Sequence, residues 1–300
     1  MTDGLQFREN GTFTILQLTD MHIGSEPWKD EDERTLSLAA RLIAQEQPDL
    51  IVYTGDLIWS EGVQNPIASF RRAISPAIES GIAWAVVFGN HDAEENVTRE
   101  QLMAIAEQQA GCLSMAGPSK LNGIGNYALA IVSSQADKAA AILYFFDSGA
   151  TAPEMVGGYD WIRSSQVEWY RKLSKDYRLQ NETALPALAF FHIPLPEYKE
   201  CWELGAESGS KGEEVCCPKL NSGLFAAMVE SGDVTGTFAG HDHDNDYCGT
   251  LHGIKLCFGR VTGYNTYGSL SRGGRVIRLT EGERAFDTWL ALDEPSSLSV

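Results

Sequence analysis

Apolar and polar positions follow one repeated order over the first ninety residues: a short apolar run, a polar cluster, then helical spacing. The short runs are rich in β-branched and aliphatic residues, as strands are, and occupy residues 13–19, 50–54 and 82–88. Between them, residues 32–47 and 66–80 carry apolar side chains at helical intervals; Pro48 ends the first helix and Pro76 interrupts or kinks the second. Strands that alternate with helices predict a parallel sheet, and therefore an α/β fold.

The rest of the chain adds further strands and helices. Strand-like runs occupy residues 127–133, 139–146, 185–191, 234–239, 254–258, 275–279 and 285–292, and helical spacing marks residues 164–177 and 223–231. Residues 197–221 are long and aperiodic, which predicts a loop-rich flap beside a functional site. Because no repeat or linker is visible, we expect a single domain over residues 1–294 and a frayed tail at 295–300.

Polar residues collect directly after the predicted strands. The clusters are Asp20 with His22, Gly55-Asp56, Gly89-Asn90-His91-Asp92, His192, and Gly240-His241-Asp242-His243. Five of the six histidines belong to these clusters, since His252 alone lies outside them. Ligands gather at the carboxyl ends of strands in open α/β sheets. Carboxylate, amide and imidazole groups are donors for hard or borderline metal ions, so the clusters predict a metal site.

These five ordered clusters resemble the signature of the calcineurin-like metallophosphoesterases, over residues 13–279. The resemblance implies an α/β fold, a multilayer αββα sandwich of two mixed sheets flanked by helices. It also implies a dinuclear-metal phosphoesterase, in which a metal-bridged hydroxide attacks phosphate mono- or diesters of small molecules. Residues 221–249 look most like the small single-domain branch that is called purple-acid-phosphatase-like.

The resemblance also implies the metal ligands and the catalytic residues. Asp20, His22 and His243 would hold one metal, Asn90, His192 and His241 would hold the other, and Asp56 would bridge the two. The donors suit manganese, iron or zinc, divalent or trivalent, and leave the choice open.

The neighbours of Asn90 carry the implied catalytic roles. His91 would protonate the leaving oxygen or hold the phosphoryl group, and Asp92 would orient the His91 ring. The alternative for Asp92 is a cap on the following turn. Glu94 and Glu95 are expected to be solvated charges.

Several other polar residues have less specific interpretations. We expect Asp242, Asp244, Asn245 and Asp246 to be turn residues or acceptors for ligand N–H groups. Asp147 is expected to be a turn carboxylate. Arg260 and Tyr264 could touch substrate, or could serve the core or the surface.

The chain departs from the purple acid phosphatases at two positions. Those enzymes place an iron-binding tyrosine three residues after the bridging aspartate, where this chain has Trp59, which cannot ligate. The first cluster also has His22, where those enzymes lack a histidine. We therefore expect the generic metal site of the superfamily and no purple, tyrosinate-bound iron.

Charge and composition bear on the partners. The formal net charge of −18 disfavours nucleic acid, whose binding depends on clustered Lys and Arg, so a small phosphorylated substrate is expected. Two alternatives stay open: a non-catalytic metal-binding scaffold of the same fold, or a nuclease. No signal peptide and no membrane-length apolar run is visible, which favours a cytoplasmic protein. The six cysteines are expected to be free thiols, with Cys201 bridged to Cys216 or Cys217 as the alternative.

Overall fold

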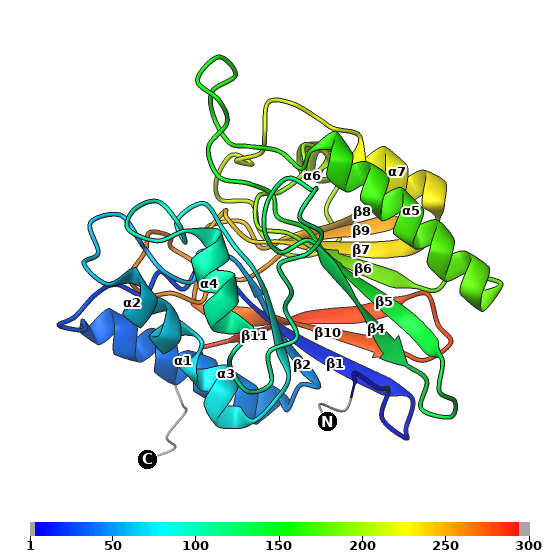
Figure 1. Ribbon diagram of the computed structural model, residues 1–300, viewed down its shortest axis with the longest axis horizontal. Helices are drawn as coiled ribbons and strands as arrows, with labels where there is room; N and C mark the ends of the chain where they lie inside the picture. The colour runs from blue at the N-terminus through cyan, green and yellow to red at the C-terminus, as the bar shows by residue number, and fades with distance from the viewer. Residues whose placement is uncertain (1–3, 294–300) are drawn as a thin grey trace.

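Two β-sheets lie face to face in the computed structural model, which describes residues 4–293, and helices cover both outer faces (Figure 1). The first sheet has five strands in the order β11-β10-β1-β2-β3. These strands are β1 (Thr12–Leu18), β2 (Leu50–Thr54), β3 (Trp84–Val87), β10 (Gly273–Thr280) and β11 (Phe286–Leu292). β1, β2 and β3 run parallel, whereas β10 runs antiparallel to both of its neighbours, so this sheet is mixed.

The second sheet is also mixed and has six strands in the order β4-β5-β6-β7-β9-β8. Its strands are β4 (Tyr127–Val132), β5 (Ala139–Phe145), β6 (Ala187–Phe190), β7 (Val234–Ala239), β8 (Cys248–Leu251) and β9 (Ile254–Phe258). β5, β6, β7 and β9 run parallel to one another, and the edge strands β4 and β8 run antiparallel to their neighbours.

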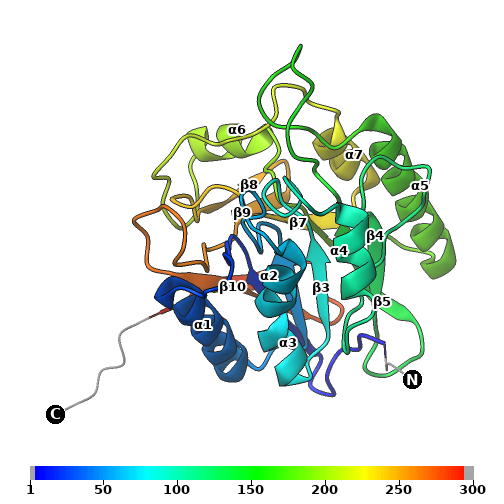
Figure 2. The same cartoon turned by 60° about the vertical axis from the view of Figure 1, so that its left-hand side comes forward.

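The helices form the two outer layers. Those that follow the strands of the first sheet are α1 (Asp30–Glu46), α2 (Pro66–Ala73), α3 (Ser75–Ser80) and α4 (Arg99–Ala106). Those on the side of the second sheet are α5 (Ser164–Asn181), α6 (Glu197–Glu203) and α7 (Leu224–Ser231). Figure 2, turned by 60°, shows α1 to α4 in front of the first sheet and α5 to α7 beyond the second.

Alternate side chains of each strand enter different cores, which explains the apolar runs. In β2, Ile51 and Tyr53 pack under the helices of the first layer, while Leu50 and Val52 enter the core between the sheets. A strand that is buried on both faces carries an almost continuous apolar sequence. The structure therefore confirms the predicted α/β sandwich of two mixed sheets flanked by helices.

The helix expected over residues 66–80 is interrupted, as predicted, and forms the two helices α2 and α3, because Pro76 lies at the second position of α3 and cannot continue α2. Two other elements differ from the prediction. Residues 197–203 form helix α6 where a loop was expected, although residues 204–221 contain no helix or strand. Strand β8 was missed because its four residues include Gly249, so it has no readable alternation.

The missed strand explains an error about the cysteines. Cys248 on β8 lies opposite Cys257 on β9, with 4.2 Å between their Cα atoms, and the two form a disulfide. The expectation of free thiols is wrong for this pair, since only the hairpin places the two residues together. Within residues 4–293 the thiols of Cys112, Cys201, Cys216 and Cys217 are free.

One guanidinium links the two halves of the sandwich. Arg99, the first residue of α4, forms an ion pair with Asp147, which follows β5 and has a fully buried side chain. Arg99 also donates hydrogen bonds to the carbonyl oxygens of Gly89 (2.7 Å) and Gly149 (2.8 Å). Asp147 is thus a structural carboxylate, as expected, and its partner joins loops from both sheets.

No helix within residues 4–293 combines the length and apolarity needed to cross a bilayer.

Arg99→Met is expected to lower the free energy of unfolding by about 3–5 kcal/mol, because the buried Asp147 carboxylate loses its counter-charge. Urea unfolding measures the change. Arg41→Met is the matched control: it removes an ion pair with Asp293 in which the arginine is 54% exposed, and should cost less than about 1 kcal/mol. Equal losses in the two variants would contradict the role of Arg99.

Candidate metal centre

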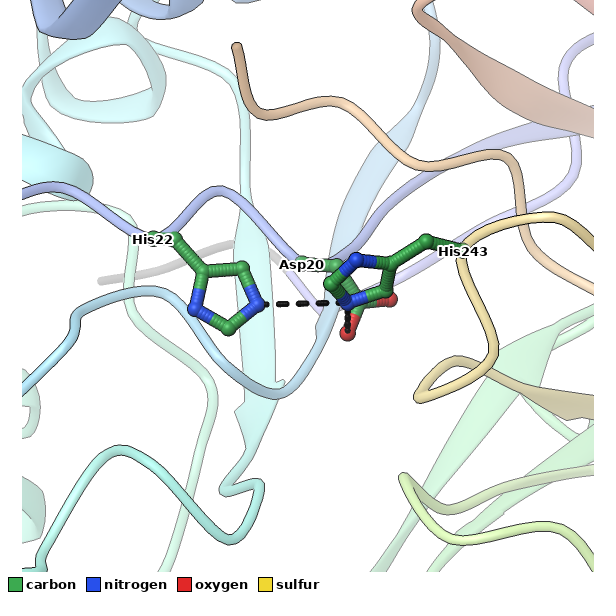
Figure 3. A group of neighbouring side chains, drawn as sticks. All are labelled: Asp20, His22 and His243. Atoms are coloured by element: carbon green, nitrogen blue, oxygen red, sulfur yellow. Dashed lines mark hydrogen bonds and ion pairs between the residues drawn. The ribbon is translucent and has the colours of Figure 1, made fainter. Parts of the chain in front are cut away.

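The first group of candidate ligands comes from the loops after β1 and β7. Nε2 of His243 lies 3.4 Å from Oδ1 of Asp20 and 3.3 Å from Nε2 of His22. All three side chains are at most 4% exposed. Figure 3 shows the two imidazole rings converging beside the carboxylate, although His22 and His243 are 221 residues apart in sequence. These nitrogen and oxygen atoms can hold one metal ion.

The second group comes from the loops after β2, β3, β6 and β7, and centres on Nε2 of His192. This atom lies 3.1 Å from Oδ2 of Asp56, 3.2 Å from Oδ1 of Asn90 and 3.2 Å from Nδ1 of His241. Asp56, His192 and His241 are buried, and their donor atoms lie within 4.8 Å of one another. The group can therefore hold a second metal ion.

Asp56 lies between the two groups. The same Oδ2 atom that faces His192 is 3.8 Å from Nε2 of His22 in the first group. Its other oxygen, Oδ1, accepts a hydrogen bond from the backbone N–H of His91 at 2.8 Å. The carboxylate is thus fixed at one oxygen and directed toward both groups at the other. All seven candidate ligands are therefore brought together, in the two sets that the family resemblance implies.

Tight backbone turns place these donors. Eight non-glycine residues in the described chain have positive φ, and four of them are the candidate ligands Asp20, His22, Asp56 and His241. Such conformations are unfavourable for L-residues and cluster at functional sites. Glycine is required beside them: a Cβ on Gly89 would collide with the Asp56 carboxylate, and one on Gly240 with Thr19. The glycines of the sequence clusters thus permit close approach of the loops.

The electrostatics fit bound cations. Burial lowers the pKa of His22 and of His241 to about 3, so both rings are neutral, which is the form that ligates a metal. Burial opposes the charge of His192 too, but the Asp56 carboxylate outweighs it and raises the pKa of His192 to about 9. The Nδ1 atom of His192 lies 2.7 Å from the carbonyl oxygen of Thr54 and donates to it, so Nε2 is the nitrogen that faces the other donors, where a cation can take the place of a proton. The donor set therefore suits two metal ions.

His91 lies at the edge of the centre, and its partner is not the predicted one. Its Nδ1 atom is 2.7 Å from Oε1 of Glu94, and its ring stacks on Trp59 with the centroids 4.6 Å apart and the planes at 16°. The side chain of His91 is 26% exposed, so a substrate can reach it. The expectation that Glu94 is a solvated charge is wrong, because Glu94 also accepts a hydrogen bond from the backbone N–H of Glu61.

The prediction that Asp92 orients His91 is wrong. Both carboxylate oxygens of Asp92 are directed away into the protein and accept backbone N–H groups, at 2.7–3.1 Å, from Asp56, Leu57, Ile58 and Gly89. Burial, together with the charge of Asp56, raises the pKa of Asp92 to about 6. Asp92 therefore anchors the two loops that carry Asp56 and Asn90. The sequence could not separate Asp92 from Glu94, since both are carboxylates close to His91.

The remaining predicted residues have structural roles. Asp242 accepts hydrogen bonds from Asn245 (2.8 Å) and the N–H of Cys216, and Asp244 accepts the N–H of Ser269. Asp246 forms a buried ion pair with Arg260, which resolves the role of Arg260 in favour of the core. The carboxylates after His241 are therefore structural, but they join this loop to distant segments and do not simply close a local turn as predicted.

Aromatic residues around the centre were missed by the sequence reasoning. Tyr159 packs its ring edge-on against His241 at 4.3 Å, and Tyr267 stacks on His243 at 4.1 Å. Trp59 was noted only as a residue that cannot ligate, yet it covers His91. Neither tyrosine belongs to a polar cluster at a strand end, so no local pattern identified it.

With this geometry in place, comparison with known proteins identifies the family. The family model described as calcineurin-like phosphoesterase matches residues 13–245. The chain belongs to the calcineurin-like phosphoesterases, a family built on a dinuclear metal centre.

Individual relatives carry different names. The chain is 37% identical to an Arabidopsis thaliana protein named probable inactive purple acid phosphatase 29, over 96% of this chain and 82% of that protein. It is 35% identical to phosphatase DCR2 of Saccharomyces cerevisiae, over 96% of this chain and 55% of that protein. A dimetal phosphatase from Danio rerio shares the fold, with a TM-score of 0.58 and 13% identity over 92% of this chain and 98% of that one. Because the names include both a phosphatase and a probable inactive protein, turnover has to be argued from the residues of this chain.

The different roles of Asp92 and Glu94 predict different effects of their substitution on thermal stability and metal content. Asp92→Asn places an amide against backbone N–H groups, so the loops of Asp56 and Asn90 loosen, and both the melting temperature and the metal content per chain should fall. Glu94→Gln is the matched control and should keep both, since Glu94 contacts none of the candidate ligands. Thermal unfolding and elemental analysis measure these effects. A Glu94→Gln protein that loses metal as Asp92→Asn does would contradict this assignment.

Proposed function

We propose that this protein is a dinuclear metal-dependent hydrolase of phosphate mono- or diesters of small molecules. The observation that carries the proposal is the position of Asp56, whose Oδ2 atom faces a histidine of each ligand group, at 3.1 and 3.8 Å. One carboxylate shared by two cations is the arrangement that a two-metal phosphoesterase needs. Asp20, His22 and His243 hold one metal in this proposal, and Asn90, His192 and His241 hold the other.

The proposed metals are two ions of manganese, iron or zinc. Carboxylate, amide and imidazole donors suit these metals, and Trp59 removes the tyrosinate ligand of a purple iron site. When bound, the two ions supply the positive charge that binds the phosphoryl oxygens and the activated water that attacks phosphorus.

His91 supplies the proton in the proposed mechanism. The Nδ1 atom of His91 is engaged by Glu94 at 2.7 Å, which leaves Nε2 as the nitrogen available to the leaving oxygen. Trp59 fixes the plane of the ring by stacking, so Glu94 and Trp59 are positioning residues. The partial exposure of His91 gives a substrate access to it, whereas the proposed ligands other than Asn90 are buried.

The competing proposal is a non-catalytic metal-binding scaffold. The name of the Arabidopsis relative, probable inactive purple acid phosphatase, favours it. The completeness of the site opposes it: all seven ligands, His91 and a carboxylate partner for His91 are present and converge. The acidic chain, with a net charge of −18, makes a nuclease the weaker alternative.

The direct test combines metal content with turnover. Elemental analysis of the purified protein should find about two metals per chain. An aryl phosphate and an aryl phosphodiester, each with and without added manganese, should reveal metal-dependent hydrolysis and rank the two ester classes. Bound metal without turnover of either ester would support the scaffold instead, and absence of metal binding would refute both proposals.

His91→Ala should keep both metals but lower turnover by about 10²–10⁴-fold, because the proton donor is removed while every ligand stays. Steady-state hydrolysis, with elemental analysis of the same sample, separates the two effects. Unchanged turnover would remove His91 from the mechanism.

Asp56→Asn should reduce the metal content below two per chain. The Asn amide oxygen can still accept the N–H of His91, so the fold is kept while the shared negative charge is lost. Asp137→Asn, at an exposed carboxylate, is the matched control and should keep full metal content. Full occupancy of both sites in Asp56→Asn would contradict the bridging role.

A further inference from the structure

A groove of about 480 Å³ opens beside the first ligand group. It is lined by Trp59, by Lys29 and Glu31, and by the segment Tyr264–Tyr267, which follows β9. The segment is tied to the ligands themselves: the side-chain amide of Asn265 donates to the carbonyl oxygen of His22 (3.2 Å), and Thr266 Oγ1 forms a hydrogen bond with Nδ1 of His243 (3.0 Å). The aromatic groove, as we call it, is therefore continuous with the candidate metal centre.

The walls of the aromatic groove are rings with free surface. Trp59 stacks on His91 yet is 37% exposed, and Tyr267 stacks on His243 yet is 56% exposed. Each ring therefore has one face held by a histidine while the rest of the side chain lines the groove. Tyr264 also lines the groove, and the guanidinium of Arg34 lies over its ring, 3.8 Å from the ring centre. Rings that are fixed in this way lose little freedom when a planar ligand stacks on them.

The charges of the aromatic groove favour an uncharged occupant. Lys29 and Glu31 are the ionisable side chains that line it other than tyrosines, and their charges are opposite. A second phosphate or a carboxylate on the substrate would not be attracted, because the groove has no net positive charge. A neutral ring can bind there without an electrostatic cost.

We propose that the aromatic groove binds a planar aromatic group on the leaving oxygen of the substrate, a nucleobase or an aryl ring, and thereby selects phosphate esters that carry one. The inference rests on the proposed function, in which His91 protonates the leaving oxygen. The organic group attached to that oxygen begins beside His91, and Trp59 is in direct contact with His91. A planar substituent that contacts Trp59 lies in the groove that Tyr264 and Tyr267 also line.

The cavity on the other side of the loop 89–93 does not compete for this role. It measures about 410 Å³, but four of its charged groups are already paired, Arg99 with Asp147 and Arg163 with Asp160, and the remaining one is the carboxylate Glu100. The Trp161 ring that lines it is covered by the Arg163 guanidinium, 3.6 Å from the ring centre. A ligand there would have to displace existing contacts, whereas the aromatic groove offers free ring surface.

Adenosine 5′-monophosphate and ribose 5-phosphate test the proposal, because they share the same phosphate and the same primary alcohol as leaving group and differ in the base. The ratio of their kcat/KM values should favour the nucleotide by about tenfold or more, the scale of stacking one base on an aromatic residue. Tyr267→Leu should lower this ratio several-fold, and Tyr267→Phe, which keeps the ring and loses only the hydroxyl, should preserve it. The ratio cancels any effect of either variant on metal binding.

Calorimetric binding of adenosine, with ribose as its control, gives a readout independent of turnover. Adenosine should bind more tightly than ribose, and Tyr267→Leu should remove the difference. A kcat/KM ratio within twofold of one, together with equal binding of adenosine and ribose, would refute the proposal that the aromatic groove binds a planar group. It would leave the proposed phosphoesterase activity unaffected. Adenosine binding that depends on Tyr267, without turnover of any ester, would support the proposed ligand of the aromatic groove and refute the proposed hydrolase function.

Discussion

The structure depends on the burial of carboxylates and imidazoles at the edge where the two sheets meet. Charged and polar groups removed from water are stable only when they are paired or coordinate metals. Here Asp20, Asp56 and His192 are nearly inaccessible, and the Asp56 oxygen that faces both ligand groups has histidine nitrogens as its partners. The parallel strands converge on this edge, so each loop contributes one or two donors. The sandwich can be understood as a scaffold that holds these donors in place.

A set of backbone contacts keeps the loops from relaxing. Asp92 gathers four N–H groups from the loops after β2 and β3, and Arg99 ties the loop after β3 to the loop after β5. Positive φ at four candidate ligands shows that the turns adopt conformations that only such surroundings maintain. Above this rigid layer, His91 is partly exposed and is held by Glu94 and Trp59. The contrast between the mostly buried candidate ligands and the partly exposed His91 fits the proposed hydrolysis of phosphate esters.

Periodicity predicted the sheets and the helices, and the strand-end clusters predicted a metal site, because both signals are local. The assignment of the seven candidate ligands came from the family resemblance that these clusters carry. The errors arose where a role depends on contacts between distant segments. Asp92 and Glu94 follow His91 at similar spacing, and only the loop geometry shows that Glu94 faces the ring. Strand β8 and the Cys248–Cys257 disulfide depend on pairing with β9. Tyr267 reaches His243 from 24 residues away in sequence, through a loop that has no periodicity.

The most direct test of a dinuclear centre is anomalous X-ray diffraction from crystals grown with manganese. The account predicts two anomalous peaks about 3.5–4 Å apart. One should lie among Asp20, His22 and His243, the other among Asn90, His192 and His241, with the Asp56 carboxylate in contact with both. A single peak, or a pair of peaks away from Asp56, would contradict the central claim.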